Sequence, residues 1–281
     1  MAEIQYVKDS FDSYLGNKQA ISASDCKNFM KSPMYYYTNK YEAKKQTRAR
    51  HFAVGSALHE SILEPHKFFD NYVIQPKFDL RTKAGKEGFE LFERENKGKT
   101  LLTQDEMEMI TKICESALKN ETLMELIRDS HKELSIYTTD DITGLKIKLR
   151  PDVYSTNKST ITDLKSCMDS SPKAFKGNVY SFGYSLTNAF YCDFAKKENY
   201  VFAALEKESP YQVTLYQLSD DMIEYGRNQY RTALDLLKWS YDNNYWCDYS
   251  EFILLKECYE LGNLFDFFEI KKDSTLIHIL N

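Results

Sequence analysis

Two aspartates and a lysine in the middle of the chain have the residue types and the spacing of a metal-dependent hydrolytic site. Asp152 closes the segment 146–152, and Asp163 and Lys165 lie two residues apart in the segment 161–165. Carboxylates are preferred ligands of Mg²⁺, and a metal-bound water beside an ammonium group suits the hydrolysis of a phosphodiester. These three residues are therefore candidate catalytic groups, with the two aspartates as metal ligands.

Both segments have the pattern of β-strands. Apolar residues at 145, 147 and 149 alternate with Lys148, Arg150 and Asp152, which should share the opposite face of the strand. The short link 155–159 predicts that the two strands are neighbours. Pro151 would interrupt a hydrogen-bond ladder, so we expect a kink there. Lys148 and Arg150 would then either neutralise the carboxylates or contact a phosphate.

A histidine and a glutamate are further candidate ligands. An apolar stripe at 54, 58 and 62 predicts a helix over 52–64. His59 lies on this helix, and Gly55, four residues earlier, would leave room for the helix to approach the sheet. A histidine on an apolar helix is more often a core residue than a ligand. Glu133 begins a predicted strand over 133–138 and is either a further acid near the metal or a solvated edge residue.

The order of predicted elements indicates one α/β domain over residues 1–281. Residues 1–20 are polar and predicted to be loose, and 21–130 are mainly helical. Residues 131–245 contain three strands, a helical region, two strands and a long helix, and so predict a sheet with flanking helices. In the tail 246–281, the segments 266–269 and 275–280 could add a strand to a sheet edge or to a partner.

Composition excludes several classes of protein. The net charge is −5, so the chain is not a uniformly basic nucleic-acid coat, and a nuclease would need its basic residues gathered in a channel. The six cysteines have no C-x-x-C spacing, which favours reduced core thiols over a zinc site. The N-terminus lacks a signal-peptide pattern, and no apolar run approaches about 20 residues. We expect a cytoplasmic protein without a membrane span.

Four stretches of the chain resemble the PD-(D/E)xK nuclease superfamily, and within it the RecE-like (exodeoxyribonuclease VIII-like) exonucleases of phages and prophages. Together they span about residues 20–195. They are an S-x-S…S-P pattern at 22–33, a G-x-x-x-H…L-E-P helix at 55–65, the segment 81–86, and the catalytic hairpin at 148–152 and 163–165 followed by Ser171-Pro172. A D-x-K triplet alone is common by chance, whereas the ordered set is fairly specific.

The resemblance implies a restriction-endonuclease-like mixed central β-sheet flanked by helices, with a helical N-terminal part. It implies a Mg²⁺ site, with Mn²⁺ as an alternative, formed by the carboxylates of Asp152 and Asp163 and the backbone carbonyl of Leu164. His59 would complete the site, and Lys165 would orient or activate the attacking water.

The resemblance also implies how DNA is bound and used. Ser22 and Ser24, at a helix N-terminus, would hold a 5′-phosphate or simply cap the helix. The other candidate DNA contacts are Arg81 and Lys83, for which a solvated loop is equally plausible, together with Lys148, Arg150 and Tyr191. The family's activity would be 5′-to-3′ digestion of double-stranded DNA ends, leaving a 3′ single strand for an annealing protein, by a ring-shaped homo-oligomer such as a tetramer.

One departure from the family pattern keeps alternatives open. Thr187 stands where these relatives have a glutamine that helps to order the site, and Asn188, one step along, would replace it only if the helix rotated. This favours, as a second hypothesis, a catalytically weak nuclease-fold protein that binds DNA ends or acts as a scaffold. A third hypothesis is a site-specific endonuclease.

Overall fold

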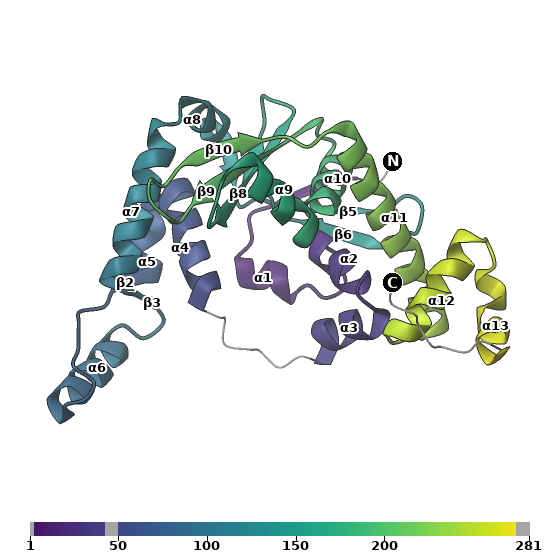
Figure 1. Cartoon of the computed structure of the whole chain (residues 1–281), viewed down its shortest axis with the longest axis horizontal. Helices are drawn as coiled ribbons and strands as arrows, with labels where there is room; N and C mark the ends of the chain where they lie inside the picture. Colours follow the sequence, from purple (N-terminus) through teal and green to yellow (C-terminus); the bar gives the residue numbers. More distant parts are fainter. Residues whose placement is uncertain (1–2, 43–49, 274–281) are drawn as a thin grey trace.

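The structure is a computed structural model that describes residues 3–42 and 50–273. Its centre is a five-stranded sheet in the order β10-β9-β8-β7-β4, in which β8 and β9 run parallel and the other pairs are antiparallel. The predicted α/β fold with a mixed central sheet flanked by helices is confirmed (Figure 1). The strands are β4 (Ser130–Lys132), β7 (Val153–Ser155), β8 (Thr160–Cys167), β9 (Asn199–Glu206) and β10 (Val213–Tyr216).

A second sheet is antiparallel and has the order β1-β5-β6. It is formed by β1 (Gln5–Val7), β5 (Ser135–Thr139) and β6 (Lys146–Leu149). A separate parallel pair joins β2 (Tyr72–Ile74) to β3 (Thr100–Leu102). The N-terminal strand β1 closes the outer edge of β5, so the second sheet depends on a segment far away in the sequence.

The chain passes from one sheet to the other just before Asp152. The strand at 146–152 was expected to lie beside the strand at 161–165, but this was wrong, because β6 pairs with β5, and β7 pairs with β8. The kink predicted at Pro151 is present, since β6 ends at Leu149 and β7 begins at Val153. The predicted strand 133–138 also begins later than expected, because Glu133 lies in the bend between β4 and β5, and β5 begins at Ser135.

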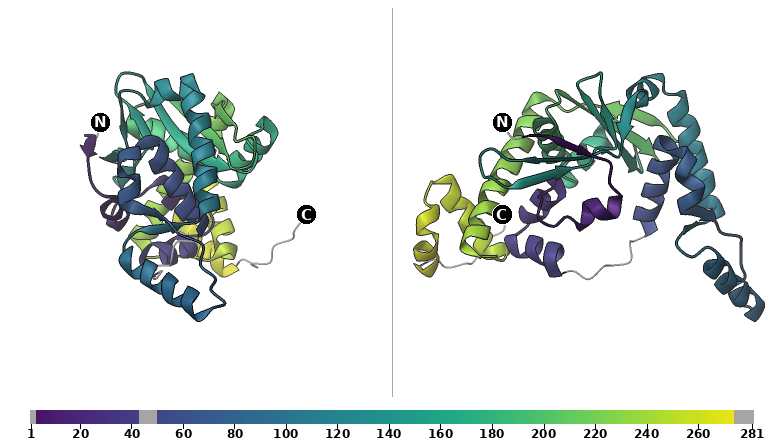
Figure 2. Two further views of the ribbon diagram at one scale, coloured as in Figure 1. Left: turned by 90° about the vertical axis from the view of Figure 1, so that its left-hand side faces the viewer. Right: turned by 180° about the vertical axis from the view of Figure 1, so that it is seen from behind.

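Helices cover both faces of the central sheet, and each face has its own hydrophobic core (Figure 2). On one face lie α4 (Arg50–Leu63), α7 (Gln104–Lys119) and α8 (Glu121–Ile127). The other core includes α2 (Ala23–Phe29), α9 (Pro172–Ser181), α10 (Tyr184–Ala195) and α11 (Asp220–Asn243). Strand alternation sends Ile161 of β8 into the second core and Leu164 into the first. Asp163 and Lys165 therefore share the side of Ile161.

Figures 1 and 2 show an arched molecule, with some of the remaining elements at its two ends and α1 under its middle. The helix α6 projects from one end, and α12 and α13 form the other end. These elements are α1 (Phe11–Gly16), α3 (Pro33–Tyr37), η1 (Thr38–Glu42), η2 (Pro65–Lys67), α5 (Phe68–Asn71), α6 (Lys83–Glu95), α12 (Tyr249–Glu260), η3 (Leu264–Asp266) and α13 (Phe267–Asp273). Among the described residues, no helix combines the length and the hydropathy that crossing a bilayer requires.

Helices α10 and α11 approach each other closely because of one glycine. A Cβ atom on Gly226 of α11 would lie 2.1 Å from the backbone oxygen of Ser185 in α10. Any other residue would force the two helices apart. Gly226 therefore fixes the position of α10, the helix that presents Tyr184 and Tyr191 to the central sheet.

Both ends of the chain differ from the predictions. Residues 1–20 were expected to be loose, yet they form β1 and α1, and Tyr14 is buried against the second sheet. The predicted strand at 266–269 is helical, because Phe267 packs in the core formed with Trp239. The predicted strand at 275–280 lies outside the described residues.

The N-terminal segment covers the face on which Lys148 was expected to meet DNA. Lys148 is 5% exposed, and its Nζ donates hydrogen bonds to the carbonyl oxygens of Tyr14 and Asn17, at 2.8 and 2.7 Å. The prediction of a phosphate contact for Lys148 is therefore wrong. The side chain instead fastens residues 14–17 to β6.

Replacing Lys148 by methionine should destabilise the fold without weakening DNA binding. The two carbonyl groups would lose their buried partner, which costs about 1–3 kcal/mol. Urea denaturation of Lys148→Met measures the loss, and Lys146→Met, an exposed position on the same strand, is the matched control. A large loss of DNA affinity with unchanged stability would contradict this role.

Candidate functional site

Two acidic residues meet where the chain crosses between the two sheets. The register places Lys132 opposite Val153 on one side of the crossing and Ile136 opposite Leu149 on the other. Between them, Glu133 has a φ of 51°, a left-handed conformation that costs a non-glycine residue about 1–2 kcal/mol. Its N–H donates to the carbonyl of Asp152 at 3.1 Å. The bend therefore holds Glu133 beside Asp152, and such local strain is common at functional sites.

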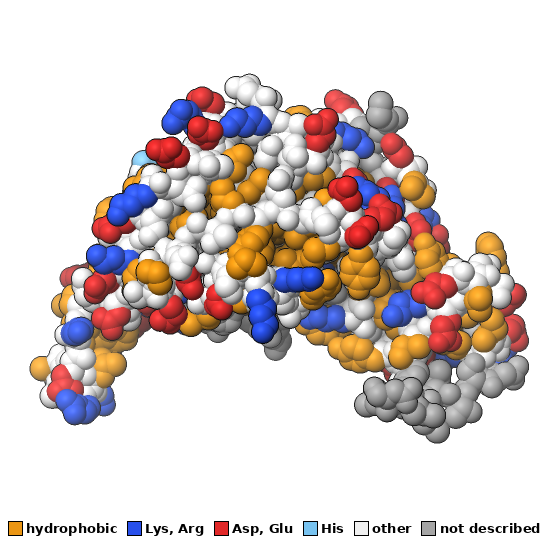
Figure 3. All heavy atoms as spheres, turned by 45° about the horizontal axis from the view of Figure 1, so that its top comes forward, with side chains coloured by type: hydrophobic (Ala, Val, Ile, Leu, Met, Phe, Trp, Pro, Cys, Tyr) orange, Lys and Arg blue, Asp and Glu red, His pale blue; other side chains and the backbone are white. Residues whose placement is uncertain are grey.

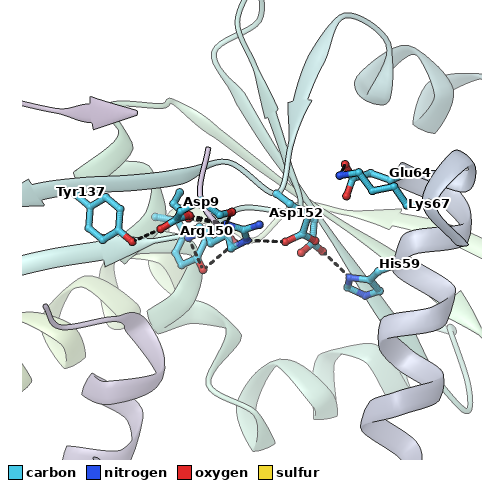
Figure 4. A network of polar contacts seen from close by, with 10 residues as sticks. Asp9, His59, Glu64, Lys67, Tyr137, Arg150 and Asp152 are labelled. Carbon is cyan, nitrogen blue, oxygen red and sulfur yellow. Dashed lines mark hydrogen bonds and ion pairs between the residues drawn. The ribbon is translucent and has the colours of Figure 1, made fainter. Parts of the chain in front are cut away.

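His59 reaches the same point from α4. Its Nδ1 lies 3.4 Å from Oδ2 of Asp152, and the backbone N–H of Leu164 donates to the same oxygen at 2.7 Å. Figure 4 shows His59 and Arg150 on opposite sides of Asp152. Gly55 does not serve close packing as expected, because a Cβ atom there would meet nothing within 4 Å. One helical turn before His59, the glycine leaves open space instead.

The three side chains form a donor set that suits a hard divalent cation. One ligand atom from each of His59, Glu133 and Asp152 lies within 4.8 Å of the others. Two carboxylate oxygens and an imidazole nitrogen are accepted by Mn²⁺, and Mg²⁺ also takes carboxylate oxygens. The side chains present therefore fit the divalent metal that the sequence predicted.

Asp163 and Lys165 lie beside this set and contact each other. Oδ2 of Asp163 is 2.5 Å from Nζ of Lys165, and Asp163 is 7% exposed. Lys165 also sits over the ring of Tyr184, with Nζ 5.3 Å from the ring centroid. Within the described residues, the cluster of close donor atoms consists of His59, Glu133 and Asp152, and it leaves out Asp163, which was also predicted as a metal ligand. The structure thus brings all four predicted catalytic residues together, but it turns Asp163 toward the lysine.

The electrostatics of the site follow from burial and from the mutual effects of these charges. Burial and the Asp152 carboxylate raise the pKa of Glu133 to about 7, although His59 and Arg150 oppose this. Burial and Asp152 likewise raise the pKa of Asp163 in spite of Lys165. Burial disfavours the charged forms of Asp152, His59 and Lys165, but their oppositely charged neighbours dominate. The pKa of Asp152 is therefore lowered, and the pKa values of His59 and Lys165 are raised.

Divalent-metal affinity should therefore rise steeply with pH near neutrality. Glu133, with a pKa of about 7, and His59, with a raised pKa, must both lose their protons before they ligate a metal. We expect up to about a tenfold gain in affinity per pH unit for each such proton between pH 6 and 7, with the Glu133 contribution levelling off above pH 7. Calorimetric titration with Mn²⁺ measures this, and Glu133→Gln should flatten the profile. A pH-independent affinity would contradict it.

Arg150 pairs with the carboxylates of Glu133 and Asp9, which agrees with the alternative that it neutralises acids, whereas its phosphate contact stays a prediction. Its Nε donates to Glu133 Oε2 at 3.0 Å, and its Nη1 donates to Asp9 Oδ1 at 3.0 Å and to Ser135 Oγ at 2.6 Å. Tyr137 donates its hydroxyl to Asp9 at 2.8 Å (Figure 4). Sequence reasoning missed Asp9, because it lies in the polar N-terminal segment and no local pattern connects it to Arg150.

Tyr191 also braces this bend. Its hydroxyl donates to the carbonyl of Arg150 at 3.4 Å and accepts from the N–H of Arg150 at 3.5 Å. The hydroxyl is therefore engaged with the backbone, and the predicted DNA contact is replaced by a structural one. Thr187 donates to the carbonyl of Gly183 within its own helix, and Asn188 is 1% exposed beside Cys192. Among the described residues, the hydrogen bonds of these two side chains stay within α10 and its N-cap.

The other predicted DNA contacts lie in two places. Ser22 accepts from the N–H of Asp25 and donates its hydroxyl to the Asp25 carboxylate, so it caps α2 in a capping box; Ser24 is exposed on the same helix. Arg81 and Lys83 lie at the start of the projecting α6, where they pair with Asp79 and Glu87. This arm extends away from the central sheet (Figure 1).

Comparison with known proteins supports the fold. The sequence profile of a family described as "PDDEXK-like domain of unknown function (DUF3799)" matches residues 22–256. A "putative exonuclease" from Eubacterium rectale superposes with a TM-score of 0.58 at 15% identity, covering 85% of this chain and 88% of its own. A phage-related exonuclease from Haemophilus somnus overlaps with a TM-score of 0.31 at 12% identity, over 67% of this chain and 95% of its own. No curated protein sequence matches. The first superposition shows a shared fold.

Proposed function

Because the chain belongs to this PDDEXK-like family, we propose that it is a Mg²⁺- or Mn²⁺-dependent deoxyribonuclease that digests double-stranded DNA from its ends. The observation that supports the proposal most directly is the clustering of His59, Glu133 and Asp152 next to the Asp163–Lys165 pair. Segments far apart in the sequence supply these groups, and three of them are buried or half-buried acids. Structural ion pairs alone would not require so many acids at one point.

The residues divide the chemical work between them. A divalent ion held by Asp152, Glu133 and His59 would acidify a water molecule and offset charge on the scissile phosphate. Asp163 keeps Lys165 charged and aimed at the site, where the ammonium group would hold the attacking oxygen or stabilise the charge that develops on phosphorus. Arg150 fixes the carboxylate of Glu133. The backbone carbonyl of Leu164 remains a proposed additional ligand.

We further propose the finer properties that the family resemblance implies. These are 5′-to-3′ polarity, a 3′ single-stranded product for a phage-type annealing protein, and a ring-shaped homo-oligomer such as a tetramer. Separately, we propose the cytoplasmic location that the sequence predicted. A ring would allow an acidic outer surface to coexist with a basic channel, in agreement with the net charge of −5.

The test is a cleavage assay on end-labelled linear duplex and on closed circular DNA. We expect Mg²⁺ or Mn²⁺ to support progressive shortening of the linear duplex, EDTA to stop it, and circular DNA to resist. Rapid cutting of the circle would instead identify a site-specific endonuclease.

A non-catalytic scaffold is the second candidate. It is favoured by Thr187, whose hydroxyl donates to the carbonyl of Gly183 within its own helix where the resemblance implies a glutamine that orders the site. Tight binding of DNA ends without any cleavage at metal concentrations that saturate the protein would establish the scaffold and refute the enzyme.

A further inference from the structure

The exposed ring of Phe182 lies near the candidate catalytic lysine, with the ring of Tyr184 between them. Lys165 sits over the ring of Tyr184, and the ring of Tyr184 contacts that of Phe182, with a centroid distance of 5.7 Å and a tilt of 32°. Tyr184 is half-buried, whereas Phe182 is 57% exposed. Successive nucleotides of one stacked strand are about 3.4 Å apart along the helix axis. Phe182 therefore lies within a few nucleotides of any phosphate that Lys165 contacts.

The backbone holds Phe182 in a defined position. Its N–H donates to the carbonyl of Asn178 at 2.9 Å, and its own carbonyl accepts from Nζ of Lys27 at 3.3 Å. Gly183 follows with a φ of 62°, and a Cβ there would lie 2.9 Å from Cδ of Lys27. Gly183 therefore permits the sharp turn between α9 and α10 that presents the ring. An exposed ring on a fixed backbone is prepared for a ligand at little entropic cost.

Positive charge accompanies this ring. Nζ of Lys27 donates to the carbonyl of Phe182, and Nζ of Lys165 sits over the ring of the neighbouring Tyr184. Figure 3 shows hydrophobic side chains gathered in the middle of the face turned to the viewer, with lysine or arginine side chains among them. Aromatic rings interleaved with lysines are typical of surfaces that bind single-stranded nucleic acid.

We propose that Phe182, together with the ammonium groups of Lys27 and Lys165, forms a subsite for single-stranded DNA, in which the Phe182 ring stacks on an unpaired base within a few nucleotides of the scissile phosphate. The inference rests on the proposed function and specifies its substrate, namely an end whose bases are already separated. A base inside a duplex has both faces stacked on its neighbours, so it cannot offer a face to the ring. The lysines neutralise the backbone of the same strand.

The test compares a duplex that has an unpaired end containing 2-aminopurine with a blunt duplex of the same sequence. All proteins carry Lys165→Met and are titrated in Mg²⁺, so that the strand stays intact. We expect the reference protein to quench the fluorescence of the unpaired base by stacking. Adding Phe182→Ala should abolish the quenching and raise the Kd for the tailed duplex about 5- to 100-fold, with little change for the blunt duplex.

Three comparisons make the result specific. Phe182→Trp should keep both affinity and quenching, and Phe182→Leu, which keeps apolar bulk but lacks a π-face, should lose the quenching. Phe265→Ala removes a ring that is 98% exposed in the C-terminal arm and should change nothing. The subsite would be overturned if Phe182→Ala left the quenching and the Kd unchanged, or if it weakened the binding of both duplexes equally. Cleavage of DNA by the wild-type protein would in that case still support the proposed nuclease function. Absence of wild-type cleavage would refute the proposed function itself, and the subsite with it.

Discussion

Replacing Asp152 by asparagine is expected to lower the rate of DNA cleavage at least about 1,000-fold and to remove the thermal stabilisation that Mn²⁺ or Mg²⁺ gives the protein. One oxygen of Asp152 faces both His59 and the N–H of Leu164, at 3.4 and 2.7 Å. Asparagine keeps the size of the side chain but loses the negative charge that binds a cation. Cleavage of end-labelled duplex and the metal-dependent shift in Tm measure the two effects.

The matched control is Glu60→Gln on α4. Glu60 neighbours His59 in sequence, but its carboxylate accepts a hydrogen bond from Asn71, away from the cluster. We expect this variant to keep both cleavage and the metal-dependent shift in Tm. If Asp152→Asn retained a metal-dependent shift of wild-type size, Asp152 would not be a ligand, and the site would have to be built around other groups.

Local signals were sufficient to predict how several of the candidate site residues are placed. Asp163 and Lys165 share a face because strand alternation leaves no other arrangement, and the kink at Pro151 follows from the missing N–H. The helix that carries His59 was apparent from its apolar stripe. Each of these inferences depends on neighbours within a few positions, where geometry is fixed by the backbone itself.

Contacts between distant segments were beyond the reach of such signals. Lys148 and Arg150 alternate with apolar residues as exposed residues would, yet residues 9–17 fold over them and accept their hydrogen bonds. The sequence of a strand does not indicate whether a distant segment will fold over it. Glu133 was interpreted either as a further acid near a metal or as a solvated edge residue, but its left-handed conformation was not predicted, because glutamate has no local preference for it.

The C-terminal helix shows the same limitation for a short apolar run. The segment 266–269 has two phenylalanines between acids, a pattern that four residues cannot assign to a strand or a helix. Packing decides the matter, because the rings of Phe267 and Phe268 both contact Trp239 of α11. Burial of the Phe267 ring therefore stabilises the helix through contacts that form only in the folded chain.

Lys165→Met should separate catalysis from metal binding. We expect cleavage to fall at least about 1,000-fold, as with Asp152→Asn, because no cation then stabilises the attacking oxygen or the charged transition state. Metal affinity should persist, since His59, Glu133 and Asp152 remain. Affinity should even increase slightly, because Lys165 is a positive charge close enough to lower the pKa of Asp152.

Comparison of Lys165→Met with Asp152→Asn distinguishes a catalytic role of Lys165 from a structural one. Lys158→Met, at the opposite end of the β7–β8 hairpin, should behave as wild type, since its Nζ contacts the carbonyl of Glu125. A protein in which Lys165→Met loses metal binding as completely as Asp152→Asn would use the lysine to maintain the site's structure. Loss of cleavage with metal binding retained would instead support a role for Lys165 toward the substrate, because the Asp163–Lys165 ion pair is then dispensable for holding the ion.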